Sequence, residues 1–270
     1  MSVFNHSHFH DEAAAFAKLE SILWPDGPVC PHCGAAHRIY ALEGVRSKAS
    51  RKNPEGVERH GLKKCGHCRK QFTVRVGTIF EDSHAPLHKW LQAIHLLCAS
   101  KKGISAHQLH RILEVQYKTA WFMAHRIREA MRATPNTMLG GGGGVVEMDE
   151  TFIGYQRGVP IKRGHAHKQA VLTLVSREGE ARSFHIDRAR MEDVVPVARA
   201  NISKEATVVT DTAAYYRLLH LVFAEHETVN HSKDEWARGL IHTNTVEGYF
   251  SVFKRGMRGT YQHCTEKHLH

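Results

Sequence analysis

From Ile241 to Arg255 the chain reads IHTNTVEGYFSVFKR, a pattern that predicts a helix seated on a core. The apolar residues that recur at the i, i+4 and i+7 spacing of one helical face are Val246, Phe250 and Phe253. Glu247 and Lys254 are two helical turns apart, so both side chains project from one face. A carboxylate followed by a lysine in this way suits an enzyme that holds a divalent metal against a phosphate. A surface helix with a solvated charged face is the alternative, and the residues upstream weigh against it.

Upstream of this helix the sequence alternates between strand and helix patterns. Strands are predicted over residues 145–154, 170–175, 181–186 and 206–211, with 227–231 as a candidate fifth strand. Residues 191–201 suit a helix that either kinks at Pro196 or begins there. The apolar residues of a further helix after the fourth strand are Tyr215, Leu218, Leu219 and Val222. This order of elements predicts a mixed sheet flanked by helices.

Acidic residues fall at positions of this sheet where they can meet. Asp149 lies within the first strand and Asp211 ends the fourth, and adjacent strands are about 4.8 Å apart. With Glu247 as a third carboxylate, they would hold two magnesium ions about 3.5–4 Å apart for phosphodiester chemistry. An aspartate at a strand end also caps helices, which is a second explanation for Asp211. Glu150 alternates to the face opposite Asp149, whereas Glu147 shares that face and could be a neighbouring acid.

Residues 84–135 have the pattern of a helix-turn-helix. A first helix with Trp90 is followed by a short helix that Ser105 caps, and a longer helix opens near Tyr117. The second helix of such a pair enters the major groove of DNA. The basic residues expected to contact phosphates or bases are Lys118, Arg126, Arg128 and Arg132. A plain helical bundle is the alternative, which the basic balance of the chain disfavours.

Two CxxC motifs predict a zinc site near the N-terminus. Cys30 and Cys33 are answered by Cys65 and Cys68, and two such knuckles fit a tetrahedral zinc ion. Two disulfides are the alternative, which a cytoplasmic chain would not favour. Residues 71–78 alternate as a strand does and complete a zinc ribbon.

Glycines and turn residues divide the chain into parts. The run Gly140 to Gly144 has no side chains to pack and is predicted as a flexible linker. The predicted parts are an N-terminal helix (1–25), the zinc ribbon (26–80), the helix-turn-helix region (84–135), the glycine-rich linker (136–144) and the mixed-sheet domain (145–270).

The composition fits a soluble protein that binds a polyanion. The chain has 270 residues, 42% of them hydrophobic, which is enough for two cored domains. Its net charge of +10 and its pI of about 9.4 favour nucleic acid as a partner. It has neither the pattern of a signal peptide nor a membrane-spanning stretch, so we expect a cytoplasmic protein without a membrane partner.

Three groups of residues together resemble the catalytic blocks of the zinc-ribbon, ISXO-like family of bacterial insertion-sequence transposases. The groups are Asp149-Glu150-Thr151, Val209-Thr210-Asp211, and His242 to Gly248 with Lys254-Arg255-Gly256. The resemblance extends to the ribbon and to residues 118–128, so it covers nearly the whole chain. It implies an α/β protein whose ribonuclease H-like catalytic domain carries an Asp-Asp-Glu or Asp-Asp-Asn triad followed by a lysine.

The same resemblance implies an activity and partners. Magnesium or manganese at the triad would support cutting of element ends by water and joining of the 3′ hydroxyl to target DNA. Arg255 beside Lys254 would contact the DNA. Because two ends must be brought together, we expect at least a dimer on double-stranded DNA.

Two points stay open in the sequence. Asn244 and Glu247 are three residues apart on the helix, and either fits the third position of the triad. Charge favours Glu247, since three carboxylates neutralise two cations better than two carboxylates and an amide do. Residues 261–270 read as the start of another helix, and the family usually continues there, so we expect a truncated copy.

The alternatives in function follow from the same residues. A sequence-specific DNA-binding protein derived from an inactivated transposase would keep the ribbon and the helix-turn-helix. A nuclease of the same fold without strand transfer would keep the triad. The presence of all three carboxylates favours the transposase over the inactivated protein and does not distinguish it from the nuclease.

Overall fold

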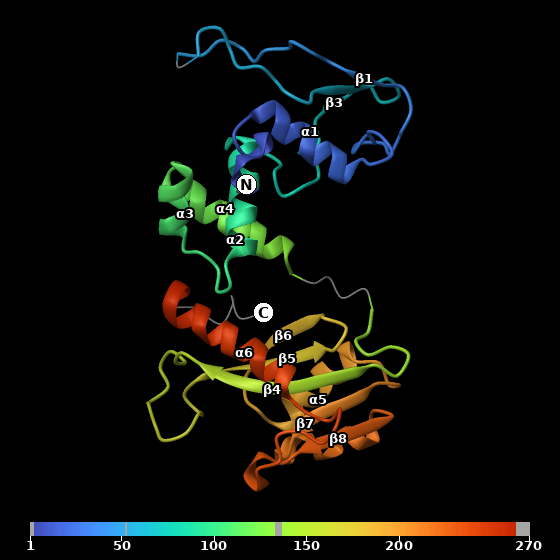
Figure 1. Cartoon of the computed structure of the whole chain (residues 1–270), viewed down its shortest axis with the longest axis vertical. Coiled ribbons are helices and arrows are strands. Elements are labelled where there is room, and N and C mark those ends of the chain that lie inside the picture. The colour runs from blue at the N-terminus through green and yellow to red at the C-terminus, as the bar shows by residue number, and fades with distance from the viewer. Residues whose placement is uncertain (1–2, 52, 133–136, 263–270) are drawn as a thin grey trace. The chain divides into compact units, whose positions relative to one another are not determined.

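A computed structural model describes residues 3–51, 53–132 and 137–262 and divides the chain into two compact units, Met1–Arg132 and Ala133–His270 (Figure 1). Each unit has its own buried cores. The expected helix at the C-terminus, and with it the expected truncation, falls on residues 263–270, outside the described part of the chain. Residues 133–136, which include the end of the predicted helix-turn-helix region and the first residue of the predicted linker, lie outside it as well.

Four helices form the main core of the N-terminal unit. They are α1 (Glu12–Leu23), α2 (Leu87–Ala99), α3 (Ala106–Leu113) and α4 (Tyr117–Ala130), and the short turns η1 (Val3–Asn5) and η2 (Ser7–Phe9) precede them. Trp90 of α2 is fully buried there, packed with Phe16 and Leu19 of α1. The helix predicted over residues 1–25 therefore shares one core with the helices predicted over 84–135.

The predicted helix-turn-helix is present in this unit. Ser105 caps α3 by accepting a hydrogen bond from the Gln108 amide, and Gln108 reciprocates in a capping box. Glu114 ends α3 in the left-handed conformation, with φ at 53°, and α4 begins three residues later. The short helix, tight turn and longer helix are those that the sequence predicts.

The zinc ribbon is a small antiparallel sheet of β1 (Ile39–Ala41), β2 (Lys63–Cys65) and β3 (Gln71–Phe72), in that order. The strand predicted over residues 71–78 is wrong beyond Phe72. Val74 turns instead into the helical core, where it is buried. The guanidinium of Arg75 donates hydrogen bonds to the carbonyls of Phe80, Ser83 and Ala85, and this folds the segment back.

The C-terminal unit is built on a mixed sheet of five strands in the order β6-β5-β4-β7-β8. Strands β4, β5 and β6 are antiparallel neighbours, whereas β7 runs parallel to β4 and β8 runs parallel to β7. The strands are β4 (Val145–Ile153), β5 (Gln169–Ser176), β6 (Ala181–Ile186), β7 (Thr207–Asp211) and β8 (Glu225–Val229). This topology with its flanking helices is ribonuclease H-like, as predicted.

Helices cover both faces of the sheet. On one face lie α5 (Met191–Asn201) and η3 (Ala214–Leu221), which share a core with Met148 and Leu172. On the other face α6 (Asn244–Gly256) packs Val246 and Phe250 against Val175, and Figure 1 shows it crossing in front of β4 and β5. All of β5 is buried between these layers. The short elements η4 (His231–Lys233) and η5 (Met257–Tyr261) flank α6 in sequence.

Two local details differ from the expectations. Helix α5 begins at Met191 and continues through Pro196, so the proline does not mark its start. The fifth strand runs over Glu225–Val229, two residues earlier than predicted, because its backbone pairs with all of β7.

The glycine run predicted as a linker is folded onto the sheet domain. Leu139 is buried in its core and pairs with Ile202, and the amide of Gly144 donates to the Gly140 carbonyl. At Gly140, φ is +69°, and a Cβ would lie 2.7 Å from the Cβ of Ala206. Packing therefore requires glycine at position 140. The run Gly140 to Gly144 is a tight turn of the sheet domain and not the flexible linker that was predicted.

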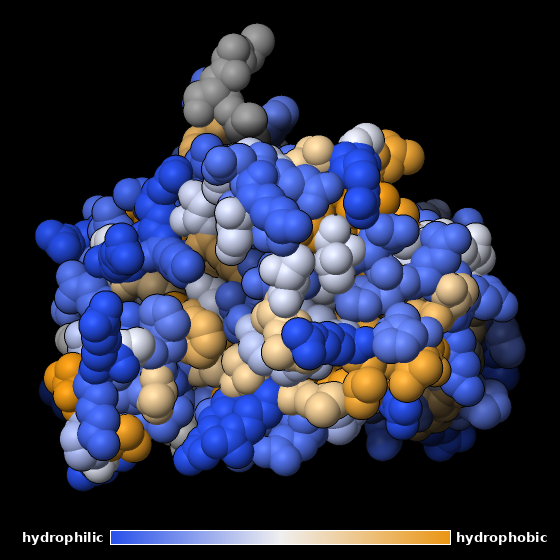
Figure 2. All heavy atoms as spheres, turned by 90° about the horizontal axis from the view of Figure 1, so that it is seen from below, coloured by the Kyte–Doolittle hydropathy of each residue, from blue (hydrophilic) through white to orange (hydrophobic). Residues whose placement is uncertain are grey.

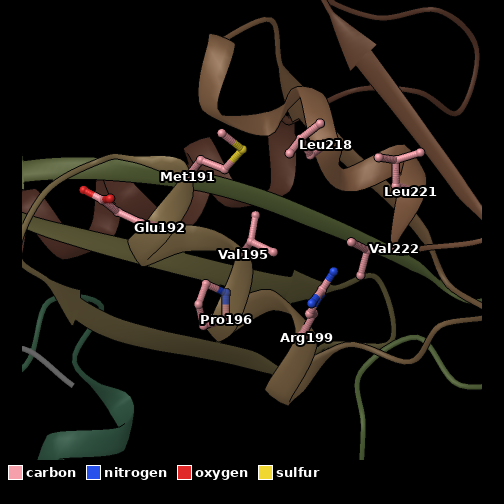
Figure 3. A pocket seen from close by; sticks show the side chains of 8 residues that line it. All are labelled: Met191, Glu192, Val195, Pro196, Arg199, Leu218, Leu221 and Val222. Carbon is pink, nitrogen blue, oxygen red and sulfur yellow. The ribbon is translucent and has the colours of Figure 1, made fainter.

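A shallow apolar groove lies between α5 and η3, with a volume of about 290 Å³. Figure 3 shows Met191 and Val195 of α5 facing Leu218 and Val222. The groove is on the sheet face opposite α6. Elsewhere, the side of the molecule drawn in Figure 2 is mostly hydrophilic, with apolar side chains gathered in separate patches.

Charge is divided unequally between the two units. Residues 1–132 contain 20 Lys and Arg and 11 Asp and Glu, whereas residues 133–270 contain 17 and 16. The basic character of the chain is therefore concentrated in the N-terminal unit. Within the described residues, no helix has both the length and the apolar character needed to cross a membrane.

Candidate active site and zinc centre

Four cysteine thiols converge in the ribbon. The sulfurs of Cys30, Cys33, Cys65 and Cys68 all lie within 4.8 Å of one another, and two of the pairs are 3.7 Å apart. Four sulfurs at about 2.3 Å from one zinc ion in a tetrahedron would be about 3.8 Å apart. Cys30 and Cys65 are buried beside Phe72. The cluster therefore fits a structural zinc ion, as the CxxC motifs predict.

Asp149 and Asp211 stand on neighbouring parallel strands. The pairing of β4 with β7 runs from Val145–Thr207 to Glu147–Val209, and two residues further along each strand Asp149 is level with Asp211. The strand pairing that the sequence analysis required is therefore present. One oxygen of Asp211 accepts a hydrogen bond from the Ala213 amide, but the N-cap of η3 is Ala213 and no side chain caps that element, so Asp211 is not a helix cap.

The surroundings of Asp149 disfavour its negative charge. Burial, followed by the charge of the adjacent Glu150, raises the pKa of Asp149 to about 7, and the charges of Asp211 and Glu247 act in the same direction. The hydrogen bond from the Glu150 amide opposes this rise only partly. Carboxylates that destabilise one another in this way suit a site that binds a cation.

Glu247 lies in the first turn of α6, on the sheet face that carries Asp149. Its Oε1 accepts a hydrogen bond from the Thr243 hydroxyl at 2.9 Å, and Nε2 of His231 is 3.4 Å from the same oxygen. Thr243 is buried at the start of the helix, and His231 also lies 3.3 Å from its hydroxyl. These two side chains hold the Glu247 carboxylate, and the sequence analysis identified neither of them.

Glu147 positions the helix that carries Glu247. This carboxylate is fully buried and accepts hydrogen bonds from the amides of Thr245 and Val246, at 2.8 and 3.0 Å, and from the Thr245 hydroxyl. Arg177 donates to it at 3.1 Å, and Nδ1 of His242 is 3.3 Å away. Glu147 thus caps α6 from a distant strand, because it accepts hydrogen bonds from amides at the helix N-terminus that have no partner within the helix. Strand β4 therefore carries Asp149 and also anchors the helix of Glu247.

Glu150 points to the opposite face, as its alternation predicts. Its carboxylate accepts hydrogen bonds from the hydroxyls of Tyr215 and Tyr216 in η3. Burial raises the pKa of Glu150, although the two tyrosine hydroxyls act in the opposite direction. Glu150 therefore links β4 to η3 and adds negative charge beside Asp149 and Asp211.

The remaining predicted residues of this site lie on α6. Asn244 is the first residue of the helix and is exposed. Lys254 is half-buried, with its ammonium group 5.8 Å from the ring centre of Phe250, and Arg255 is exposed. Within the described residues, the cysteines are the one group of three or more His, Cys, Asp or Glu ligands that lie within 4.8 Å of one another. The three carboxylates share one region but are not clustered as tightly.

The basic residues predicted on α4 differ in their surroundings. Lys118 is exposed, and Arg132 is exposed with an ion pair of 3.5 Å to Glu129. Arg126 is half-buried and donates to the carbonyls of Ile79 and Glu81, so its prediction as a DNA contact does not fit the structure. Arg128 is half-buried as well. The exposed part of the helix instead presents Tyr117, Trp121 and Phe122 beside Lys118.

The fold and the two sites define a zinc-ribbon protein with a ribonuclease H-like domain. Residues 10–71 match the transposase zinc-ribbon domain, and residues 140–270 match the ISXO2-like transposase domain. An uncharacterized protein in the transposable element ISH50 of Halobacterium salinarum is 28% identical over 270 aligned residues, covering 92% of this chain and 83% of that protein. The chain belongs to the ISXO2-like family of insertion-sequence transposases.

Proposed function

We propose that this protein cleaves DNA at the ends of an insertion sequence and transfers the resulting 3′ hydroxyl to target DNA. The supporting observation is that Asp149, Asp211 and the helix of Glu247 meet on one face of a ribonuclease H-like sheet. In the first step water attacks a phosphodiester, and the bond to the leaving 3′ oxygen breaks. In the second step that 3′ hydroxyl attacks a phosphodiester of the target, so one ester replaces another.

Asp149, Asp211 and Glu247 would hold magnesium or manganese. The charges of Asp211 and Glu247 already raise the pKa of Asp149, which is the electrostatic condition that a divalent cation relieves. When bound, two such ions activate the attacking oxygen and stabilise the leaving one. Glu247 is the preferred third ligand because its charge acts on Asp149, and Asn244 is the second candidate.

Other residues of the chain would position the reacting groups. Glu147 and Arg177 fix the start of α6, and His231 and Thr243 orient the Glu247 carboxylate. Lys254 and Arg255, at the far end of the same helix, would contact phosphates of the DNA.

The N-terminal unit would recognise DNA. Its excess of basic residues supplies the general attraction to phosphates, and the exposed part of α4 around Lys118 and Trp121 would enter the major groove. Arg132 would contact the backbone. We also propose that the protein acts in the cytoplasm and pairs two element ends as at least a dimer.

The test is cleavage and strand transfer on a duplex that carries the flanking inverted repeat, with magnesium or manganese. Glu247→Gln should lower the cleavage rate roughly 10²–10³-fold, because it replaces a charged metal ligand by a neutral amide, while DNA affinity stays within about threefold. The matched control is Glu192→Gln, an exposed carboxylate on α5 on the other side of the sheet. It should leave the rate unchanged.

Asn244→Ala in the same assay assigns the third ligand. A loss equal to that of Glu247→Gln would mean that both side chains serve the site. Binding without cleavage in the unaltered protein would refute the proposal and support a DNA-binding protein derived from an inactivated transposase.

A further inference from the structure

The loop between β4 and β5, residues 154–168, carries an unusual charge for its unit. It contains Arg157, Lys162, Arg163 and Lys168 and no acidic residue. The rest of residues 133–270 holds 13 Lys and Arg against 16 Asp and Glu. The loop is therefore net positive, with four basic residues and no acidic one, whereas the remainder of that unit is net acidic.

The base of this loop is fixed. The Gln156 amide donates to the His167 carbonyl at 2.8 Å, and the Gln156 side chain donates to the Lys168 carbonyl at 3.0 Å. The rings of Phe152 and His165 stack at 4.5 Å between their centres, and Tyr155 stacks on the buried ring of His167. A loop tied down in this way presents its tip in a defined direction.

The tip of the loop is exposed and its cations are not neutralised. Arg157, Lys162 and Arg163 are all exposed, and within the described residues none of them forms an ion pair. Ile161 and Tyr155 are also largely exposed, at 72% and 64%. Cations without carboxylate partners beside exposed apolar groups are the composition of a contact surface for a polyanion.

The position of the loop connects it to the acidic site. Strand β4 runs from Asp149 toward the loop, which Figure 1 shows projecting beyond the ends of β4 and β5. Asp211 ends the parallel strand β7 at this same edge of the sheet. Gly154 is five residues beyond Asp149, or about 17 Å at about 3.4 Å per residue. This distance is about five base pairs along duplex DNA.

We propose that the loop 154–168 holds the phosphate backbone of duplex DNA about five base pairs from the phosphate that reacts at the acidic site. The inference rests on the proposed function for the position of the reacting phosphate. Net attraction is needed here because the carboxylates of the site repel DNA. The loop places cations at the edge of the sheet toward which β4 runs from Asp149, where they would attract DNA that extends beyond the site.

The test compares two triple variants of the full chain that remove equal charge. The loop variant is Arg157→Ala, Lys162→Ala and Arg163→Ala, and the control variant is Arg188→Ala, Lys204→Ala and Arg217→Ala, which are exposed residues of the same unit outside the loop. Affinity for a 40-base-pair duplex is measured by fluorescence anisotropy across a salt series. Thermal unfolding of each variant verifies the fold.

The loop variant should bind about tenfold more weakly at 0.1 M salt. Its slope of log affinity against log salt should fall by roughly two to three, since each lost phosphate contact removes about 0.9. The control variant should change affinity less than about twofold. Equal effects of the two variants would overturn the proposal, because they would reflect net charge alone.

Neutral phosphate analogues locate the contact. Methylphosphonates placed about four to seven base pairs from the cleaved position should weaken binding of the unaltered protein and not of the loop variant. Equal weakening of both would contradict the proposed position. In activity assays, loss of cleavage by the loop variant would assign the loop to element ends, and loss of strand transfer alone would assign it to target DNA.

These outcomes separate the two proposals. If the unaltered protein cleaves and the loop and control variants behave alike, the inference about the loop fails and the proposed function stands. If no cleavage occurs with either metal while only the loop variant loses affinity, the proposed function fails and the loop remains a DNA contact.

Discussion

The two units of this protein differ in their net charge and in the kind of side chains gathered at their candidate metal sites. The N-terminal unit has nine more basic than acidic residues, and the four cysteine sulfurs that fit a zinc ion already lie within 4.8 Å of one another. The C-terminal unit is almost balanced in charge, and the ligands proposed for it are carboxylates; burial and the neighbouring carboxylates raise the pKa of Asp149 to about 7. This difference fits the proposed roles: zinc would stabilise the fold of the ribbon, whereas a divalent cation would relieve the repulsion among the carboxylates.

The same difference appears in how each site is built. Each pair of cysteines comes from one tight turn, and the pairing of β1 with β2 brings the two turns together. Asp149, Asp211 and Glu247 come from two strands and a helix that are separated by whole elements. Loss of zinc should therefore damage a fold, and loss of the other metal should damage a reaction.

The largest expected effect is that of Cys30→Ser. The variant should lose zinc and unfold the ribbon, because structural zinc contributes about 10–16 kcal/mol in zinc-finger peptides. The sheet domain has a separate core and should keep its thermal transition. Zinc content and calorimetry measure both effects. Cys98→Ser, at an exposed thiol of α2, is the control and should keep one equivalent of zinc. Zinc retained in Cys30→Ser would contradict the assignment.

The next effect separates two basic residues of α4. Arg126→Ala should destabilise the N-terminal unit by roughly 2–4 kcal/mol, because it removes two charge-assisted hydrogen bonds to the carbonyls of Ile79 and Glu81. Lys118→Ala should change the free energy of unfolding by less than about 0.5 kcal/mol. It should also lower the slope of log affinity against log salt by about one, as expected for the loss of one phosphate contact. Denaturant unfolding and salt titrations distinguish them. If Arg126→Ala left the free energy of unfolding unchanged, the structural role would be refuted and Arg126 would again be predicted to contact DNA.

The smallest effect is on the stability of the metal-free sheet domain. The pKa of Asp149 is about 7 in the folded protein and about 3.9 in an unfolded chain, so folding favours the protonated form. Stability is therefore lost as the pH rises from about 4 through 7, and the full penalty remains above 7.

Asp149→Asn removes this penalty. Without added divalent ions, the free energy of unfolding of this variant should exceed that of the unaltered protein by about 1–3 kcal/mol at pH 8, and by progressively less toward pH 5. Magnesium or manganese should narrow the gap by stabilising only the unaltered protein. Thermal unfolding over this pH range measures the difference, with the exposed Asp187→Asn as control. A gap that does not depend on pH would show that the charge of Asp149 is not the cause.

Much of the fold was predictable because its signals are local. The strand predicted over 181–186 and the capping of α3 by Ser105 agree with the structure residue for residue. The strand predicted over 71–78 was wrong because alternation alone did not reveal that Arg75 folds the segment back onto three carbonyls. The glycine run was misread because the glycines are required by the packing of Gly140 against Ala206, which no local pattern encodes.

The sequence likewise predicted only part of the candidate site. The residue types and their order pointed to Asp149, Asp211 and Glu247, and their roles remain proposals. The sequence analysis assigned no role to His231 or Thr243, the two side chains that hold the Glu247 carboxylate. Alternation placed Glu147 on the face of Asp149, but only the contacts with Thr245 and Val246 show what it does.

By itself the sequence determined the elements, the cysteine ligands, the basic balance and the acids available for chemistry, because spacing and composition are local properties. Asp11 caps α1 locally, whereas tertiary structure decided two other carboxylate caps. Glu12 accepts hydrogen bonds from the amides of Leu87 and His88 at the start of α2, and Glu147 does the same for α6. In both cases the cap and its helix are more than 70 residues apart. A helix N-terminus attracts any carboxylate, and at α2 and α6 the packing of distant elements selects which one reaches it.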